Sequence, residues 1–230
     1  MVFLAGSMNR TPTSQTPSAN NLLTPEFWLL AFFSLFLFFD FYYIIKTVTR
    51  QKRRKYMLEN IFKYAIFLTA WGWAGFAVDR KGLRIFVLPE ERKEDVLFKI
   101  KKELKCNNLF EDNRGWENLI QKVKEYYTGK KVDFTDYQLN LDNYTNFQKK
   151  ILQTVKKIPY GEIRSYKKAA EAAGYPRAYR AVGNTMRNNP LPLIIPCHRI
   201  IKSNGMLGGF SGKEGVALKK RMIDLESEGK

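Results

Sequence analysis

The sequence has 230 residues, which is enough for one or two domains with a substantial core. Hydrophobic residues make up 45% of it and aromatic residues 14%, so the chain as a whole is not disordered. The net charge of +17 at pH 7 predicts a polyanionic partner, either nucleic acid or an anionic membrane surface. Two distant cysteines, Cys106 and Cys197, and one histidine, His198, argue against a disulfide framework and against a Cys/His metal site.

The first 26 residues and the stretch after them differ sharply in composition. Residues 1–26 are rich in Thr, Ser, Asn and Pro, which predicts a disordered leader. Residues 27–45 are apolar or aromatic apart from Ser34 and Asp40, so we expect a transmembrane helix over residues 27–46.

The basic segment that follows indicates which side of the membrane the rest of the chain occupies. Residues 47–60 form a linker rich in Lys and Arg, which predicts a cytoplasmic location for everything after it. The alternative is a soluble cytoplasmic protein whose translation begins at Met57.

Residues 61–142 are expected to form a small N-terminal α+β domain. Runs of β-favouring residues flank a turn at residues 79–82, and apolar residues at helical spacing follow. We find no catalytic constellation here, and we interpret Cys106 as structural. The expected elements are strands at 65–78, 83–88 and 134–139, and helices at 91–104 and 116–127.

Residues 143–230 are mainly helical. Thr145 is a predicted N-cap of a helix that ends at residue 157, and Ser165 caps a second helix over residues 166–173. Pro176 is placed at the first position of a third helix, residues 177–186. The last two helices, joined near Gly174, suggest a helix-turn-helix whose second helix is the recognition element.

Charge in this region favours DNA as the partner. Residues 145–230 contain 17 Lys and Arg against 6 Asp and Glu, a net charge of +11. Periodicity alone would not establish binding, because many helical hairpins bind nothing. The charge therefore strengthens the helix-turn-helix interpretation.

The adjacent Cys197 and His198 are the candidate reactive pair. A thiol beside an imidazole is the minimal arrangement for nucleophilic sulfur chemistry, because the thiolate is the attacking species. An isolated pair of this kind is more often an inert buried cysteine beside a hydrogen-bonded histidine. After the pair we expect a strand at 199–201, a glycine-rich loop at 207–212 and a helix at 216–225 that leads to Glu226.

A series of motifs between residues 145 and 226 resembles the O6-alkylguanine-DNA alkyltransferases, also called methylated-DNA–protein-cysteine methyltransferases. The motifs occur in the family's order, and such a series is highly specific. They are Ile-Pro-Tyr-Gly-Glu (158–162), Ser-Tyr (165–166), Arg-Ala-Val-Gly (180–183), Asn-Asn-Pro (188–190), Ile-Pro-Cys-His-Arg (195–199) and Gly-Gly-Phe-Ser-Gly (208–212). Residues 72–88 also resemble the family's N-terminal domain, whereas residues 1–56 have no counterpart in it.

The resemblance implies an α+β fold. A ribonuclease H-like N-terminal domain (61–142) is followed by an all-α-rich winged helix-turn-helix domain (143–230), which carries DNA binding and the active site. The implied partner is double-stranded DNA that contains O6-alkylguanine. We expect a monomer and no cofactor or metal.

The resemblance also implies a single-use DNA repair reaction in which Cys197 takes the alkyl group irreversibly. His198 would accept the thiol proton through a water, and Glu226 would orient the imidazole, as in triad logic. Asp224 is the alternative alignment for Glu226. Asn189 would stabilise the turn around the cysteine.

The damaged nucleotide would have to leave the duplex, because a stacked base is out of reach. Arg180 would fill the vacated space, and Tyr166 would rotate the neighbouring phosphate. Phe210 replaces a Tyr found in many members, which predicts slower repair or a narrower substrate range. The implied DNA contacts are Arg180, Tyr166, Ala178, Ala181, Arg187 and Arg199, and the implied substrate pocket is Phe210, Ser211, Gly208, Gly209, Val182 and Met186.

Two other functions are compatible with parts of the sequence. One is a non-enzymatic lesion-binding module like the alkyltransferase-like proteins, which lack the reactive cysteine that Cys197 supplies here. The other is a membrane-tethered sensor in which alkylation of Cys197 is the signal, supported only by the apolar stretch at 27–45.

Overall fold

A computed structural model describes Lys46 and residues 61–106, 109–210 and 215–229. Contacts divide the chain into Met1–Arg54 and Lys55–Lys230, and all elements below belong to the second unit. The expected leader (1–26), transmembrane helix (27–46) and basic linker (47–60) lie outside the described residues, Lys46 excepted. Among the helices that are described, none is long and apolar enough to cross a membrane.

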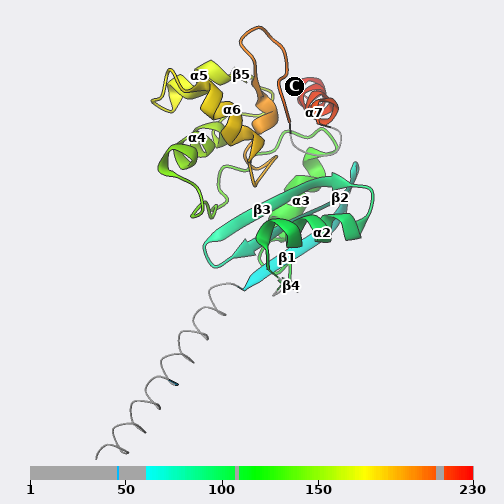
Figure 1. Ribbon diagram of the computed structural model, residues 1–230. Helices are drawn as coiled ribbons and strands as arrows, with labels where there is room; N and C mark the ends of the chain where they lie inside the picture. Colours follow the sequence, from blue (N-terminus) through cyan, green and yellow to red (C-terminus); the bar gives the residue numbers. More distant parts are fainter. Residues whose placement is uncertain (1–45, 47–60, 107–108, 211–214, 230) are drawn as a thin grey trace, which may run out of the picture. The chain divides into compact units, whose positions relative to one another are not determined.

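A four-stranded sheet forms the first part of this unit (Figure 1). Its strands are β1 (Phe62–Thr69), β2 (Gly72–Asp79), β3 (Gly82–Glu90) and β4 (Leu109–Glu111), in the order β3-β2-β1-β4. β2 is antiparallel to β1 and β3, and β4 is parallel to β1.

The expected single strand over residues 65–78 is wrong, because the chain reverses direction in the middle of it. The Thr69 hydroxyl donates a hydrogen bond to the Gly72 carbonyl at 2.7 Å and closes a tight turn. Gly72 has a φ of +125°, and a Cβ there would lie 2.5 Å from the Glu90 carbonyl oxygen. Only glycine fits this turn, which creates β1 and β2 from one β-favouring run.

Two helices cover opposite faces of the sheet (Figure 1). The first, α2 (Lys93–Leu104), packs its buried Val96 and Ile100 against Ala77, Ile85 and Val87. The second, α3 (Glu117–Tyr126), joins the main core on the other face. Both predicted helices are confirmed. The expected strand at 134–139 is wrong, because the described chain there forms only an isolated bridge between Leu139 and Leu83.

The remaining elements are mostly helices, as predicted. They are α4 (Asn146–Lys156), β5 (Arg164–Ser165), α5 (Tyr166–Ala172), α6 (Tyr179–Arg187), the 3-10 turn η1 (Cys197–Arg199), β6 (Ile200–Ile201) and α7 (Val216–Glu228). Both predicted N-caps are confirmed: Thr145 forms a capping box with Gln148, and the Ser165 hydroxyl accepts a hydrogen bond from the Lys168 amide at 3.1 Å.

Two boundaries differ from the sequence-based prediction. α6 begins at Tyr179, because the Ala178 amide bonds to the Tyr175 carbonyl at 2.9 Å and the chain around Pro176 makes a turn first. Arg199 lies in η1 rather than in a strand, and only the two residues of β6 pair, in parallel, with β5.

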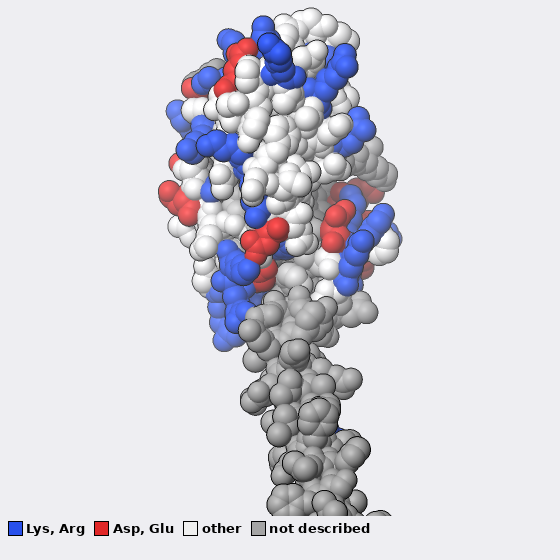
Figure 2. Space-filling view, turned by 60° about the vertical axis from the view of Figure 1, so that its left-hand side comes forward, with Lys and Arg blue, Asp and Glu red and all other residues white. Residues whose placement is uncertain are grey.

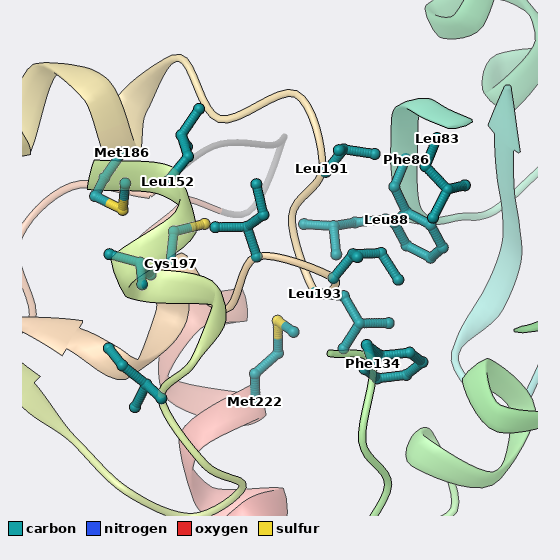
Figure 3. Close-up of a cluster of buried hydrophobic side chains, with 14 of the residues drawn as sticks. Leu83, Phe86, Leu88, Phe134, Leu152, Met186, Leu191, Leu193, Cys197 and Met222 are labelled. Atoms are coloured by element: carbon teal, nitrogen blue, oxygen red, sulfur yellow. The ribbon is translucent and has the colours of Figure 1, made fainter. Parts of the chain in front are cut away.

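The sheet holds the loop that leads to Cys197. β3 is an edge strand, and its Phe86 amide donates a hydrogen bond to the Pro190 carbonyl at 2.9 Å. Leu191 and Leu193 of the loop lie against the side of β3 that carries Phe86 and Leu88 (Figure 3). A fully buried leucine side chain contributes roughly 2 kcal/mol to stability, so this contact anchors the loop firmly.

The capping box of α4 predicts a measurable loss of stability on substitution. Thr145→Ala removes the hydroxyl that accepts from the Gln148 amide at 3.3 Å, and we expect unfolding free energy to fall by about 1 kcal/mol. Thr145→Ser keeps the acceptor and serves as the control in urea denaturation. Equal midpoints for the Ala and Ser variants would contradict the cap.

Candidate active site

Cys197 is the first residue of η1 and lies inside the core. The residue is 3% exposed, and its side chain packs among Leu152, Met186 and Met222 (Figure 3). Burial raises the pKa of this thiol, and it outweighs the opposing effects of Asn189 and Lys219. The resting residue is therefore the thiol, and it becomes a nucleophile only when a base removes the proton.

Asn189 fixes the loop before the cysteine. Its side-chain amide donates to the Ile195 carbonyl at 2.9 Å, and its oxygen accepts from the Leu191 amide at 3.1 Å. A hydrogen bond from Asn189 to Cys197 also acts to lower the thiol pKa. One buried side chain thus ties together both ends of the loop and the reactive sulfur.

His198 is fully buried and pairs with Glu226. Its Nε2 lies 2.7 Å from Oε1 of Glu226, and its Nδ1 has no hydrogen-bond partner within the described part of the chain. Asp224, the alternative to Glu226 as the partner of His198, is excluded by geometry, because its side chain is turned outward and pairs with Lys220 at 2.6 Å.

The protonation states of this pair suit a proton acceptor. Burial alone would raise the pKa of Glu226, but hydrogen bonds from His198 and Arg199 lower it to about 2. Burial lowers the pKa of His198 and outweighs the attraction of Glu226. At pH 7 the carboxylate is charged and the imidazole is neutral, so the imidazole can take up a proton.

Arg199 anchors the carboxylate, which corrects its expected role as a DNA contact. Its Nε and Nη2 each donate to Glu226 at 2.9 Å, and its Nη1 donates to the Ile158 carbonyl at 2.6 Å. The residue is only 6% exposed. A guanidinium held in this way is directed into the core and is not presented to a phosphate.

Lys219 is a functional candidate that the sequence analysis missed. It is 0% exposed, its Nζ donates to the Ile200 carbonyl, and it lies 5.8 Å from the ring centre of Tyr166 and 6.0 Å from that of Phe210. Burial lowers the pKa of Lys219 to about 8, against the opposing effect of Cys197. Its spacing of seven residues from Glu226, two helical turns, was the available signal.

Tyr126 is the other residue that was missed. It is 0% exposed, and its hydroxyl donates to Oε1 of Glu226 at 2.9 Å and lies 3.3 Å from Nε2 of His198. It comes from α3, 72 residues before His198. No local pattern in the sequence connects the two.

The expected DNA-contacting residues lie on and beside α6. Arg180, Ala181 and Arg187 are exposed on this helix, and Ala178 is half-buried just before it. Figure 2 shows Lys and Arg side chains over much of one described face, with fewer Asp and Glu among them. Such a surface suits a polyanion.

The expected pocket residues divide between the core under α6 and the glycine-rich loop. Val182 and Met186 lie on the buried face of α6. Gly208 has a φ of +71°, and a Cβ there would lie 3.0 Å from the hydroxyl of the half-buried Tyr166, so the loop rests on that tyrosine. Gly209 is next in the loop, and the Phe210 ring lies beside Lys219. Ser211 lies outside the described residues.

Comparisons with known proteins agree on one family. The model of the 6-O-methylguanine DNA methyltransferase DNA-binding domain matches residues 146–228. A methylated-DNA–protein-cysteine methyltransferase of Metallosphaera sedula is 41% identical over 115 residues, which cover 50% of this chain and 70% of the relative. The constitutive methylated-DNA–protein-cysteine methyltransferase of Bacillus subtilis is 40% identical over 126 residues, 54% of this chain and 74% of that protein.

Solved structures support the same relationship. The crystal structure of Mycobacterium tuberculosis OGT in complex with DNA is similar to this chain with a TM-score of 0.60 and 28% sequence identity. The match covers 73% of this chain and 94% of that chain. The similarity therefore extends beyond the helical part to the sheet.

The position of Lys219 predicts a pH effect on thiol reactivity. Lys219→Met keeps the volume and removes the cation, so the thiolate of Cys197 loses stabilisation and its rate of modification by iodoacetamide falls several-fold near pH 7.5. The loss is recovered as the pH rises. Peptide mapping separates Cys197 from Cys106. Lys220→Met, at an exposed neighbour paired with Asp224, is the control, and equal pH profiles for the two variants would refute the effect.

Proposed function

The chain belongs to the methylated-DNA–protein-cysteine methyltransferase family, and from this premise we propose that it repairs O6-alkylguanine in double-stranded DNA by moving the alkyl group to Cys197. The observation that carries the proposal is the buried thiol adjacent to a neutral imidazole that is itself paired with an ionised carboxylate, Glu226. In this arrangement the thiol becomes a thiolate only when the imidazole takes up its proton.

The reaction is a displacement at the alkyl carbon. The Cys197 sulfur forms a bond to that carbon while the bond from the carbon to guanine O6 breaks. The thiol proton passes through a bridging water to His198 and finally to the released guanine, which becomes the normal base. The thioether has no route back to the thiol, so each molecule acts once.

DNA binding is assigned to the helix-turn-helix of α5 and α6, in a winged domain that follows a ribonuclease H-like one. Arg180, exposed on α6, fills the space of the extruded nucleotide, and Tyr166 rotates the neighbouring phosphate. Extrusion costs a few kcal/mol, which the basic surface helps to offset. Support comes from the exposure of Arg180, Ala181 and Arg187 on one helix.

The extruded base is proposed to enter between α6 and the glycine-rich loop. Val182 and Met186 form one wall, and Gly208, Gly209 and Phe210 form the other. Phe210 has no hydroxyl to donate to the leaving guanine oxygen, which would slow repair or narrow the range of alkyl groups. A purely lesion-binding role is disfavoured because the reactive cysteine is present.

Intact mass gives the direct test of alkyl transfer. After incubation with a duplex that contains O6-methylguanine, we expect the protein to gain the mass of a single methyl group in place of one hydrogen. Cys197→Ala should show no gain, whereas Cys106→Ala should gain the same mass as the unaltered chain. Absence of the adduct on the unaltered chain under reducing conditions would overturn the proposed function.

A membrane anchor at residues 27–45 remains a prediction from composition. In cells that express the full chain, we expect the protein to sediment with membranes and to resist extraction by high salt but not by detergent. A variant that begins at Met57 is the control and should be soluble. Recovery of the full chain in the soluble fraction would refute the anchor and with it a membrane-tethered sensor.

A further inference from the structure

The buried hydroxyl of Tyr126 lies between the two partners of the proposed proton relay. It approaches Oε1 of Glu226 at 2.9 Å and Nε2 of His198 at 3.3 Å. Its ring meets the imidazole edge-on, with 6.3 Å between the centroids. A residue of the N-terminal part of the unit therefore contacts the site directly, although the matched DNA-binding family model covers only residues 146–228.

Counting donors and acceptors fixes the direction of each hydrogen bond. Burial and the nearby Glu226 raise the pKa of Tyr126 well above its ordinary value, so the phenol keeps its proton. That single proton goes to the ionised Glu226, which can only accept. The phenol oxygen therefore presents only lone pairs to Nε2 of His198.

Both polar atoms that contact Nε2 are thus acceptors, one on Glu226 at 2.7 Å and one on Tyr126 at 3.3 Å. The neutral imidazole has one proton, and the arrangement is satisfied only when Nε2 carries it. Nδ1 then has a free lone pair, and it has no partner among the residues that the structure describes.

We infer that Tyr126 is a positioning residue that, together with Glu226, holds His198 in the Nε2-protonated tautomer, so that Nδ1 is ready to receive the proton of Cys197. The inference rests on the proposed function for its catalytic part. It adds to the pairing of His198 and Glu226, because without the phenol Oε1 loses a donor and Nε2 loses its second acceptor.

Contacts with Tyr160 and Gly129 hold the phenol of Tyr126 in place. Tyr160, in the segment after α4, donates to the Gly129 carbonyl at 3.1 Å and packs edge-on against the Tyr126 ring, with centroids 6.0 Å apart. The Gly129 amide in turn donates to the Tyr126 carbonyl at 2.9 Å. The end of α3 is therefore fixed against the site, as a positioning role requires.

The test uses Tyr126→Phe, which keeps the ring and removes the hydroxyl. His198 is the only histidine in the chain, so a sample labelled with ¹⁵N-histidine reports a single imidazole. In the unaltered chain near pH 8 we expect a protonated Nε2 and an unprotonated Nδ1. In Tyr126→Phe, where Glu226 still accepts from Nε2, we expect the imidazole ¹⁵N signals to shift because Nε2 has lost its second acceptor, and alkyl transfer to Cys197 to be slower by roughly 3- to 10-fold, the effect of losing one hydrogen bond.

Tyr127→Phe is the matched control. It removes a hydroxyl that is equally buried on the same helix end but has no hydrogen-bond partner in the described structure. Both variants lose one buried oxygen, so a packing effect would appear in both. Only Tyr126→Phe should change the imidazole signals and the rate.

Two results would overturn the inference: a proton on Nδ1 in the unaltered chain, or identical ¹⁵N signals and rates in the two variants. The imidazole measurement is made on the resting protein and needs no substrate. If the unaltered chain formed no adduct, the proposed function would fail, while the tautomer would still decide the role of Tyr126 in orienting His198.

Discussion

The buried carboxylate of Glu226 is the group on which the rest of the site depends. A charge removed from water must be paired and fully hydrogen-bonded, and removing one partner of such a pair costs about 3–5 kcal/mol. Arg199 supplies the opposite charge, while Tyr126, His198 and the Gly161 amide occupy the remaining oxygen positions. These partners come from α3, the segment after α4, and η1, so one carboxylate on α7 fixes elements that are far apart in the sequence.

The reactive loop is held from two sides, and this double attachment explains how the thiol is correctly placed. Asn189 spans the loop internally, and the edge of the sheet binds it through the Phe86 amide and the Pro190 carbonyl. Preorganisation of this kind removes the need to order the loop during the reaction. The sheet, which carries no reactive group, therefore contributes to the chemistry by fixing where the sulfur lies.

Local signals in the sequence were sufficient for some features and insufficient for others. The caps at Thr145 and Ser165 depend on residues within one turn, and both were predicted. The hairpin at Gly72 was not, because β-favouring residues continue through it, and the need for glycine there comes from its φ of +125° and from the nearby backbone of the distant Glu90. The roles of Tyr126 and Lys219 also escaped prediction. Each depends on partners brought close by folding, and a tyrosine near a helix end or a lysine in a basic run looks like an ordinary core or surface residue.

The burial of Cys197 has a consequence for a protein of which each molecule can react only once. An exposed thiolate would react with peroxides, disulfides and stray electrophiles, and every such event would remove a molecule from service before it met its lesion. A thiol that is 3% exposed, with a pKa raised by its apolar surroundings, is a poor target for all of these reagents. The same packing that slows deprotonation thus acts as chemical selectivity: the sulfur is preserved until an alkylated base is delivered to it.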